Sequence, residues 1–457
     1  MCDIIIPNVK LNVNVTTRKN MDNSETIYQS KEYIRSRTAY TLYCAFEYFI
    51  TLLISDAFLA KLLKAIGVSD SVTGIISSII SFAFLFQLLS FFAASRIKNA
   101  KAVIIAANIG SQLLFAAIYL IPFADAGVKL KTFFAISCLV TGYAFSNFVA
   151  GMLFKWANSY VDKSKRGIFS AYKEVISLIG GMIFSLVMGV IVDSFDSSGN
   201  KSAGFLFLAI TVLVLTSFNF ICLMLIGGKN SGNTQKSNPP FSKIIANTLK
   251  NRNFRRIVVL TILQYTALYT TIGFMGVYKI GILGFSVAAV QIINIVANIC
   301  RAVVSAPFGR FSDRHSYAVG MKVAMGLLAA AFFINIFSAP QTKWFVIIFS
   351  VLHCVSLAGS NQNSFNIVYD YVENDCIVQA LAVKNCIGGV CGFLASLIAS
   401  RLLAVIGEEG ISVFGLTVYG QQILSAISAA VALSAVFYTK YKIENNRSKE
   451  KNQNGQS

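Results

Sequence analysis

The stretch AGFLFLAITVLVLTSFNFICLMLIG, residues 203–227, contains no charged side chain over its whole length. At a rise of about 1.5 Å per residue, a helix of this length is longer than the roughly 30 Å hydrocarbon core of a bilayer. Similar apolar stretches follow one another along the chain, about a dozen in all, each of a length suited to one bilayer crossing. The sequence therefore predicts a polytopic membrane protein built from helices.

Composition supports this prediction, because a soluble domain does not combine 55% hydrophobic with only 13% charged residues. No extended run alternates apolar and polar residues, which disfavours an outer-membrane barrel and leaves an all-α bundle. We expect twelve transmembrane helices, at residues 38–60, 71–94, 102–122, 132–157, 168–192, 203–227, 256–279, 286–309, 318–339, 343–368, 380–406 and 413–438.

A polar stretch that includes Pro239-Pro240 separates the sixth predicted span from the seventh. The chain is therefore predicted to have five parts: an N-terminal tail at 1–37, a six-helix half at 38–227, a basic linker at 228–255, a second six-helix half at 256–438 and a C-terminal tail at 439–457.

Most of the 39 Lys and Arg residues lie in the two tails, the central linker and the loops expected on the same face. The positive-inside rule then predicts that both termini and the linker are cytoplasmic, in a multi-pass protein of the cytoplasmic (plasma) membrane. The net charge of +19 reflects this topology and attraction to anionic membrane lipids. Nucleic acid is a poor partner, because the basic residues are dispersed over short loops. The polar first 37 residues do not resemble a cleavable signal peptide.

The nine cysteines lie mostly within predicted spans and without the spacing of metal ligands, so no metal site, cofactor or disulfide framework is expected. The sequence has no G-x-x-x-x-G-K-[ST] loop that would bind a nucleotide and no metal-binding H-E-x-x-H pattern. We therefore expect a protein that is not an enzyme, and any work on a solute would draw on an ion gradient.

The second half of the chain echoes the first. When Tyr160 is laid on Tyr371, the same offset superposes Lys173 on Lys384 and Gly181 on Gly392. Two halves related by a parallel repeat are typical of transporters, whose substrate cavity lies between the halves near the middle of the membrane.

The segment Gly309-Arg310-Phe311-Ser312-Asp313-Arg314-His315 resembles the G-x-x-x-D-R signature of the major facilitator superfamily, between the eighth and ninth predicted spans. The first-half copy departs from that pattern, with Phe91 and Ser95 where Gly and Asp are expected, and keeps Arg96. The run at 366–372 also resembles Firmicute members of the superfamily. The resemblance implies two six-helix halves that alternate access to a central site, in a protein that we expect to be a monomer.

A charged side chain at the centre of a bilayer costs about 2.5 to 3.5 kcal/mol on insertion scales, so each one needs a partner, a wet cavity or a function. Glu47 and Arg301 are the two such residues nearest the middle of their spans. Glu47 suits proton coupling but could instead pack helices together. Arg301 suits an anionic or hydroxyl-rich ligand but could instead pair with Glu47 or with Asn294 and Asn298 of its own span. The candidate substrate and coupling residues are Glu47, Gln87, Gln264, Asn294, Asn298, Arg301, His353 and Gln362.

Two further features bear on this site. His353 could exchange protons in a cavity or be a hydrogen-bonded core residue. Asn361, Gln362, Asn363 and Asn366 place amides on more than one face of the tenth span, so part of that helix is expected to face a cavity or a partner helix.

A second group lies near the predicted cytoplasmic face and suits a gate. By analogy with the superfamily, Asp313 would pack at the start of the fifth span, near Arg166 and Lys173, and stabilise the outward-open state. The alternative is that the lysines only mark the membrane interface. The candidate gate residues are Arg96, Arg166, Lys173, Glu174, Gly309, Asp313, Arg314 and Lys384.

The sequence thus predicts a secondary active transporter that moves a small polar or anionic solute by proton-coupled symport. A drug/proton antiporter is an alternative, weakened because the fifth span lacks the Gly-Pro pair of that class. A non-transporting sensor on the same fold and a membrane enzyme acting on lipids are further alternatives.

Overall fold

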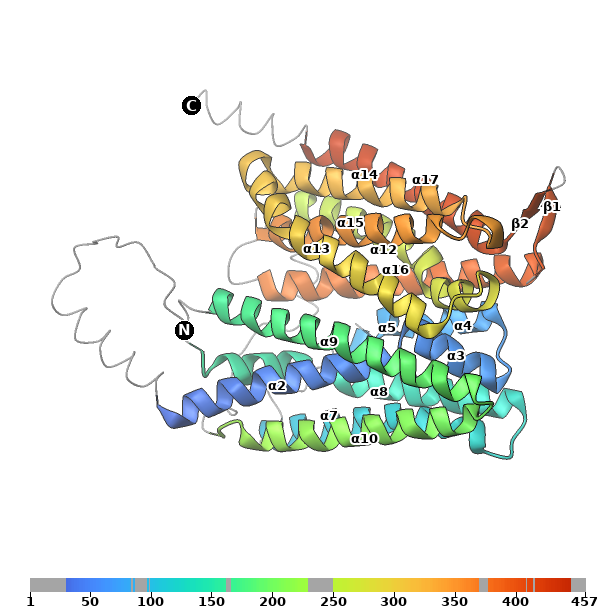
Figure 1. Cartoon of the computed structure of the whole chain (residues 1–457). Coiled ribbons are helices and arrows are strands. Elements are labelled where there is room, and N and C mark those ends of the chain that lie inside the picture. Colours follow the sequence, from blue (N-terminus) through green and yellow to red (C-terminus); the bar gives the residue numbers. More distant parts are fainter. Residues whose placement is uncertain are drawn as a thin grey trace, which may run out of the picture.

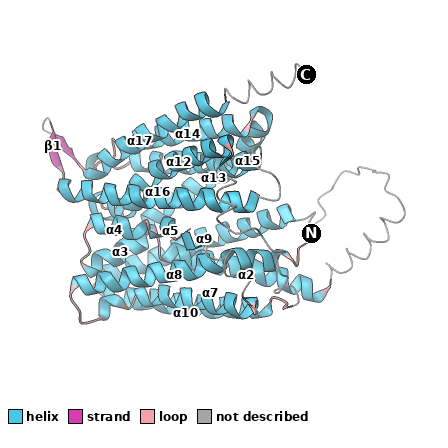
Figure 2. Ribbon diagram, turned by 180° about the vertical axis from the view of Figure 1, so that it is seen from behind, coloured by secondary structure: helices cyan, strands magenta, loops and turns pink. Residues whose placement is uncertain are grey.

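Long helices lie side by side along one common direction and form two groups (Figures 1 and 2). The computed structural model describes residues 30–83, 85–86, 97, 99–161, 166–228, 250–369, 377–407, 409–413 and 416–444. In this part of the chain, ten helices are long and apolar enough to cross a membrane. Apolar side chains are exposed on the outside of the bundle, as at Ile398 (73%) and Val405 (86%). The predicted all-helical membrane fold is confirmed, and the protein is a multi-pass integral membrane protein.

The N-terminal half packs mainly through α2, α7, α8, α9 and α10. Its elements are α2 (Lys31–Leu53), α3 (Asp56–Ile66), α4 (Asp70–Ser77), α5 (Ile79–Phe82), α7 (Ala100–Ile118), the short 3-10 helix η1 (Ile121–Phe123), α8 (Val128–Asn158), α9 (Arg166–Ser197) and α10 (Lys201–Leu225).

The C-terminal half is built around close pairs of helices, α14 with α15 and α12 with α16. Its elements are α12 (Arg252–Val277), η3 (Tyr278–Ile282), α13 (Val287–His315), α14 (Tyr317–Asn335), η4 (Pro340–Thr342), α15 (Phe345–Tyr369), α16 (Ile377–Ile406), β1 (Ile411–Val413), β2 (Leu416–Val418), α17 (Gly420–Tyr438) and η6 (Thr439–Glu444).

The first predicted span, 38–60, differs from the prediction because the helix is interrupted. α2 ends at Leu53, and α3 begins at Asp56, whose φ of 43° lies in the left-handed region. The break frees the carbonyl of Leu53, and the hydroxyl of Tyr119 donates a hydrogen bond to it. A freed backbone group inside a membrane protein needs such a partner, and this bond allows the break.

The last predicted span, 413–438, also starts later than expected. A short antiparallel hairpin pairs Ile411 with Val418, and α17 begins only at Gly420. Of the second predicted span, 71–94, the structure describes α4 and α5, and most of the remainder lies outside the described residues.

The helices run between two ends of the bundle, which we call the termini end and the hairpin end. The termini end is where α2 begins at Lys31 and η6 ends at Glu444, and the hairpin end is where β1 and β2 lie (Figure 1). One apolar core includes Leu53, Phe58 and Leu139 of the N-terminal half and extends to Val290 of α13, and another, which includes Phe254 and Phe332, lies in the C-terminal half.

Polar contacts join the two halves at the hairpin end. The carboxylate of Asp193 on α9 accepts hydrogen bonds from the backbone N–H groups of Val287 (3.2 Å) and Ala288 (2.8 Å) in the first turn of α13. Asp56 lies 3.6 Å from the ammonium of Lys279 and accepts a hydrogen bond of 3.0 Å from Asn294. We call these residues the hairpin-end clasp.

Glycines allow the halves to approach closely around the clasp. An added Cβ at Gly189 would lie 3.1 Å from the backbone of Ala288, and one at Gly74 would lie 1.8 Å from the ring of Phe274. Larger residues at these positions would push the halves apart, so the glycines allow the halves to pack closely beside the clasp.

Asp193→Ala removes the carboxylate that caps α13. Ser286 remains as the N-cap residue of α13, but two backbone N–H groups lose their acceptor and Lys61 loses a contact of 3.4 Å. We expect the free energy of unfolding to fall by about 0.5 to 2 kcal/mol, the range for losing a side-chain acceptor at the start of a helix, measured as a lower melting temperature of the purified protein in detergent. Asp125→Ala is the matched control, because Asp125 is an exposed acidic residue in a nearby loop. Equal effects of the two substitutions would contradict the capping role of Asp193.

Candidate functional site

A cavity of about 450 Å³ lies between the two halves. Its walls come from α9 of the N-terminal half and from α13 and α15 of the C-terminal half, and it occupies the middle of the bundle and the part toward the termini end. The lining residues are Glu174, Leu178, Asn298, Arg301, Ala302, Ser305, Ala358, Asn361, Gln362, Phe365 and Asn366.

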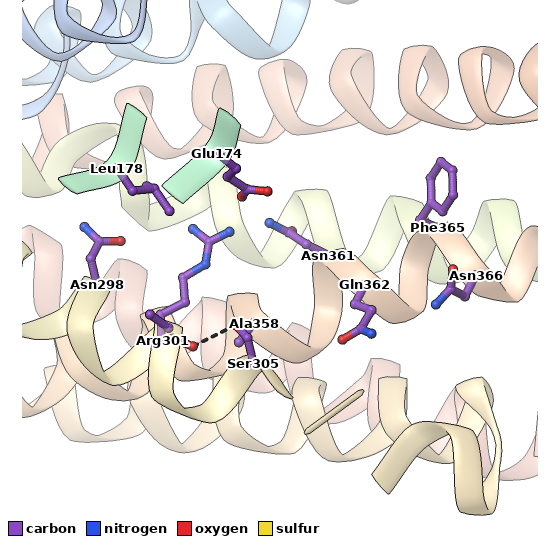
Figure 3. A pocket seen from close by; sticks show the side chains of 11 residues that line it. Glu174, Leu178, Asn298, Arg301, Ser305, Ala358, Asn361, Gln362, Phe365 and Asn366 are labelled. Atoms are coloured by element: carbon purple, nitrogen blue, oxygen red, sulfur yellow. Dashed lines mark hydrogen bonds between the residues drawn. The ribbon is translucent and has the colours of Figure 1, made fainter. Parts of the chain in front are cut away.

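Charged side chains of opposite sign face this cavity from opposite halves. The guanidinium of Arg301 on α13 extends across the cavity toward Glu174 on α9 and Asn361 on α15 (Figure 3). No direct ion pair joins Arg301 to Glu174 among the described residues, so both charges remain available to a molecule in the cavity. The five N–H donors of a guanidinium suit a carboxylate, a phosphate or adjacent hydroxyl groups.

Amide side chains supply most of the remaining polar lining. Asn298 comes from the same face of α13 as Arg301, and its amide nitrogen donates to the carbonyl of Asn294 at 2.9 Å, which leaves its oxygen for a ligand. Gln362 and Asn366 lie one turn apart on the same face of α15, and Asn361 lines the cavity beside them. The cavity can thus both donate and accept hydrogen bonds around a small polar molecule.

The close packing of α13 on α15 shapes this side of the cavity. A Cβ at Gly309 would lie 2.8 Å from the amide nitrogen of Gln362, and one at Gly359 would lie 2.3 Å from the ring of Phe308. Gly309, the first residue of the G-x-x-x-D-R segment, therefore packs directly against a residue that lines the cavity.

Of the predicted substrate and coupling residues, Asn298, Arg301 and Gln362 line the cavity. Asn294 lies one turn away from Asn298 and belongs to the hairpin-end clasp. Gln87 lies outside the described residues.

The other three predicted residues do not line the cavity. Glu47 is within hydrogen-bonding range of Ser146 on α8, at 3.5 Å. Gln264 is buried in α12. His353 stacks on the ring of Phe349, with the ring centroids 5.7 Å apart.

The predicted gate residues are spread over several environments. Glu174, expected near the gate, lines the cavity. The ammonium of Lys173 lies 5.1 Å from the ring centroid of Tyr40 on α2. Lys384 is buried and donates to the carbonyl (2.6 Å) and hydroxyl (2.8 Å) of Ser364 on α15. The two lysines matched by the sequence repeat therefore have different partners.

Asp313 and Arg314 are exposed at the end of α13, and the described residues form no ion pair with either. The side chain of Arg166, the predicted neighbour of Asp313, and the whole of Arg96 lie outside the described residues.

Sequence reasoning missed Ser305 and Phe365 as lining residues and Asp56, Asp193 and Lys279 as contacts between the halves. The spacing of the sequence could have predicted Ser305, because it is one helical turn beyond Arg301 and so shares its face. The sequence could also have predicted Asp56, because it is an acidic residue within the first predicted span. Among the described residues, no group of three or more His, Cys, Asp or Glu side chains could hold a metal ion.

The fold and the cavity between its halves define a membrane protein with a solute-sized site at its centre. The family profile of the Major Facilitator Superfamily matches residues 39–396. The chain belongs to this superfamily and is a transporter of that family. No curated protein sequence matches it significantly.

Solved structures share the fold at low sequence identity. A point mutant of the nucleoside transporter NupG has a TM-score of 0.68 at 13% identity, and the match covers 89% of this chain and 99% of that one. A POT family transporter in complex with 5-aminolevulinic acid has a TM-score of 0.65 at 12% identity, covering 88% of this chain and 95% of that one. The tetrameric transporter PepTSo2 has a TM-score of 0.63 at 13% identity, covering 91% and 99%.

Gly359→Ala tests the helix packing that shapes the cavity. The new methyl group would overlap the ring of Phe308, so we expect a loss of about 1 to 3 kcal/mol in stability, as for other overpacked sites, seen as a lower melting temperature. Gly326→Ala is the control, because an added Cβ at Gly326 has no neighbour within 4 Å. A Gly359→Ala protein as stable as Gly326→Ala would show that α13 and α15 do not pack as described.

Proposed function

We propose that the protein is a secondary active transporter that moves a small polar or anionic solute by alternating access, in symport with protons. The observation that carries this proposal is the cavity between the halves, which is lined by Arg301, Glu174 and amide side chains and lies toward the termini end from the hairpin-end clasp. A polar site at the interface of two helical bundles suits a solute path that opens alternately to each side.

The proposed topology has twelve crossings, both termini in the cytoplasm and the protein in the cytoplasmic membrane. The distribution of Lys and Arg favours this orientation. The cavity would then open toward the cytoplasm, and the clasp would close the outer side. The proposed parallel repeat gains support from Gly181 and Gly392, which are matched by the repeat and lie against Tyr48 of α2 and Tyr269 of α12 respectively.

The chemistry of the cavity favours a small solute that carries a negative group or several hydroxyl groups. A volume of about 450 Å³ is in the range of pockets for small molecules. Arg301 would bind the anionic or hydroxyl-rich part, and the amides of Asn298, Asn361 and Gln362 would orient the rest. Nucleosides and 5-aminolevulinic acid, named with two of the structural neighbours, are small polar solutes of this kind.

Glu47 is the proposed coupling group. It lies in α2, outside the cavity, where its carboxyl group is 3.5 Å from the hydroxyl of Ser146 on α8. Proton binding to Glu47 would therefore change the charge inside the N-terminal half without placing the proton on the solute itself. A carboxyl group in this position can bind and release a proton as access alternates.

Glu47→Gln tests the coupling in proteoliposomes that contain a pH-sensitive dye. A screen of sugars, organic acids, amino acids, nucleosides and cationic dyes should find a solute whose entry carries protons in wild type. In Glu47→Gln we expect solute-driven proton flux at the background level with exchange of labelled solute retained, because exchange moves no net proton. Glu409→Gln, which changes an exposed carboxylate near the hairpin, should behave as wild type.

The other outcomes of this assay identify the alternatives. Solute entry without proton movement would point to sodium coupling or facilitated diffusion, and solute moving opposite to protons would point to a drug/proton antiporter. Binding without any flux would mean a sensor on the same fold and would overturn the proposed function.

Arg301→Met and Arg301→Lys test the class of solute. Hydrogen bonds to a charged group are worth about 1.5 to 3 kcal/mol, so Arg301→Met should weaken binding by roughly 10- to 100-fold. Arg301→Lys should fall between wild type and Arg301→Met, because it keeps the charge and loses the fork of donors. Affinity is measured by solute-dependent thermal stabilisation, and Arg401→Met, at an exposed site on α16, is the control. An unchanged affinity in Arg301→Met would assign Arg301 a structural role.

A further inference from the structure

A chain of buried hydrogen bonds lies inside the N-terminal half, next to Glu47 and outside the cavity. The hydroxyl of Tyr43 on α2 donates to the side-chain oxygen of Asn108 on α7 at 2.6 Å. The amide nitrogen of Asn108 donates to the carbonyl of Ile104, one turn earlier on α7, at 2.9 Å. Tyr43 is 1% exposed and Asn108 is 2% exposed, so solvent does not compete for these bonds.

The hydrogen bonds from Tyr43 to Asn108 and from Asn108 to Ile104 can be donated in only one direction. Because the amide nitrogen of Asn108 is committed to the Ile104 carbonyl, its oxygen is the atom that faces Tyr43, and a turned amide would set two oxygens against each other. The single hydroxyl proton of Tyr43 is then committed to that oxygen. What remains at the Tyr43 oxygen is a pair of acceptor sites, with no donor left to offer.

Glu47 follows Tyr43 by one helical turn on α2, so the two side chains lie on the same face of this helix. A protonated carboxyl group can donate to the free acceptor sites of Tyr43. A carboxylate cannot, since it only accepts hydrogen bonds and Tyr43 has no proton to give. The Tyr43–Asn108 pair therefore interacts favourably with the neutral form of Glu47 alone.

Other groups around Glu47 favour its charged form. Ser146 on α8 is positioned to donate to the carboxylate at 3.5 Å, and the ammonium of Lys173 on α9 acts on it electrostatically. The remaining titratable neighbours in the described part are Tyr40 and Cys44 of α2. Glu47 thus lies between Tyr43, which offers only acceptor sites, and two groups that favour the carboxylate, the hydroxyl of Ser146 and the positive charge of Lys173.

We propose that Tyr43 and Asn108 are positioning residues that hold a proton on Glu47 through this one-way chain, and so set the pH range over which the transporter couples. This inference rests on the proposed coupling role of Glu47. Asn108 acts only through Tyr43: it takes up the hydroxyl proton and thereby prevents Tyr43 from donating to the carboxylate.

This chain of hydrogen bonds predicts the order in which variants change the pH at which Glu47 is half protonated. Tyr43→Phe removes the acceptor, and the pH at which Glu47 is half protonated should move down. Asn108→Leu should move it down further, by about one pH unit, because the released hydroxyl can then donate to the carboxylate and reverse the preference. The double variant should match Tyr43→Phe, because Asn108 has no effect without the Tyr43 hydroxyl.

Infrared difference spectroscopy of the purified full-length protein measures this midpoint directly, from the carbonyl band of the protonated carboxyl group that is absent in Glu47→Gln. The pH profile of solute-driven proton flux is measured on the same variants. Ser111→Ala, a buried polar change on α7, is the control and should leave both midpoints in place. The expected result is the order wild type, Tyr43→Phe, Asn108→Leu from high to low midpoint, with the double variant equal to Tyr43→Phe.

The outcomes separate this inference from the proposed function. A Glu47 band that titrates in wild type but does not move in Asn108→Leu, or moves to higher pH, overturns the acceptor chain and leaves proton coupling intact. A double variant in which the two shifts add also overturns it. A protein without a titrating Glu47 band overturns both proposals. If a variant transports poorly, its infrared midpoint still gives the answer, because that measurement needs no flux.

Discussion

The contact on which the rest of the arrangement depends is the bond between the Asp193 carboxylate and the first N–H groups of α13. The start of a helix carries unpaired N–H donors and a partial positive charge, so a carboxylate there is held both by hydrogen bonds and by electrostatic attraction. The contact ties α9 of one half to α13 of the other. The same two helices provide Glu174 and Arg301 further along, so the clasp at one end aligns the charged walls of the cavity at the other.

The cavity places opposite charges on the two halves. Because Arg301 and Glu174 face each other from α13 and α9, a solute that contacts both would link the halves on the side away from the clasp. Binding energy gained across the gap would favour the arrangement in which the walls are closer together. A ligand shifts a conformational equilibrium only by its difference in affinity for the two states, and contacts to both halves provide such a difference.

The sequence predicted the membrane class, most helix bounds and the superfamily well, because long apolar stretches record the bilayer directly and the segment from Gly309 to Arg314 carries the superfamily pattern. It also placed Asn298, Arg301 and Gln362 among the candidate substrate residues. It placed Glu174 near the gate and did not predict that this side chain lines the cavity. The direction of the side chain depends on the rotation of α9, which is set by packing such as Gly180 on Phe49 and Gly181 on Tyr48. His353 lies against aromatic rings, and one of these, Phe332, comes from α14, a neighbour that spacing along one span does not reveal. The interruption at Asp56 was missed because its compensation, the Tyr119 hydroxyl, lies on another helix.

That interruption has a mechanical consequence. A continuous helix transmits any tilt of one end to the other as a rigid rod, whereas α2 and α3 are joined by an articulation at Ile54 and Ser55. The eleven-residue α3 carries Asp56 and is held by Lys279 and Asn294. A tilt of α2, with Tyr43 and Glu47, would therefore not be transmitted to the anchored α3 as it would be along a continuous helix.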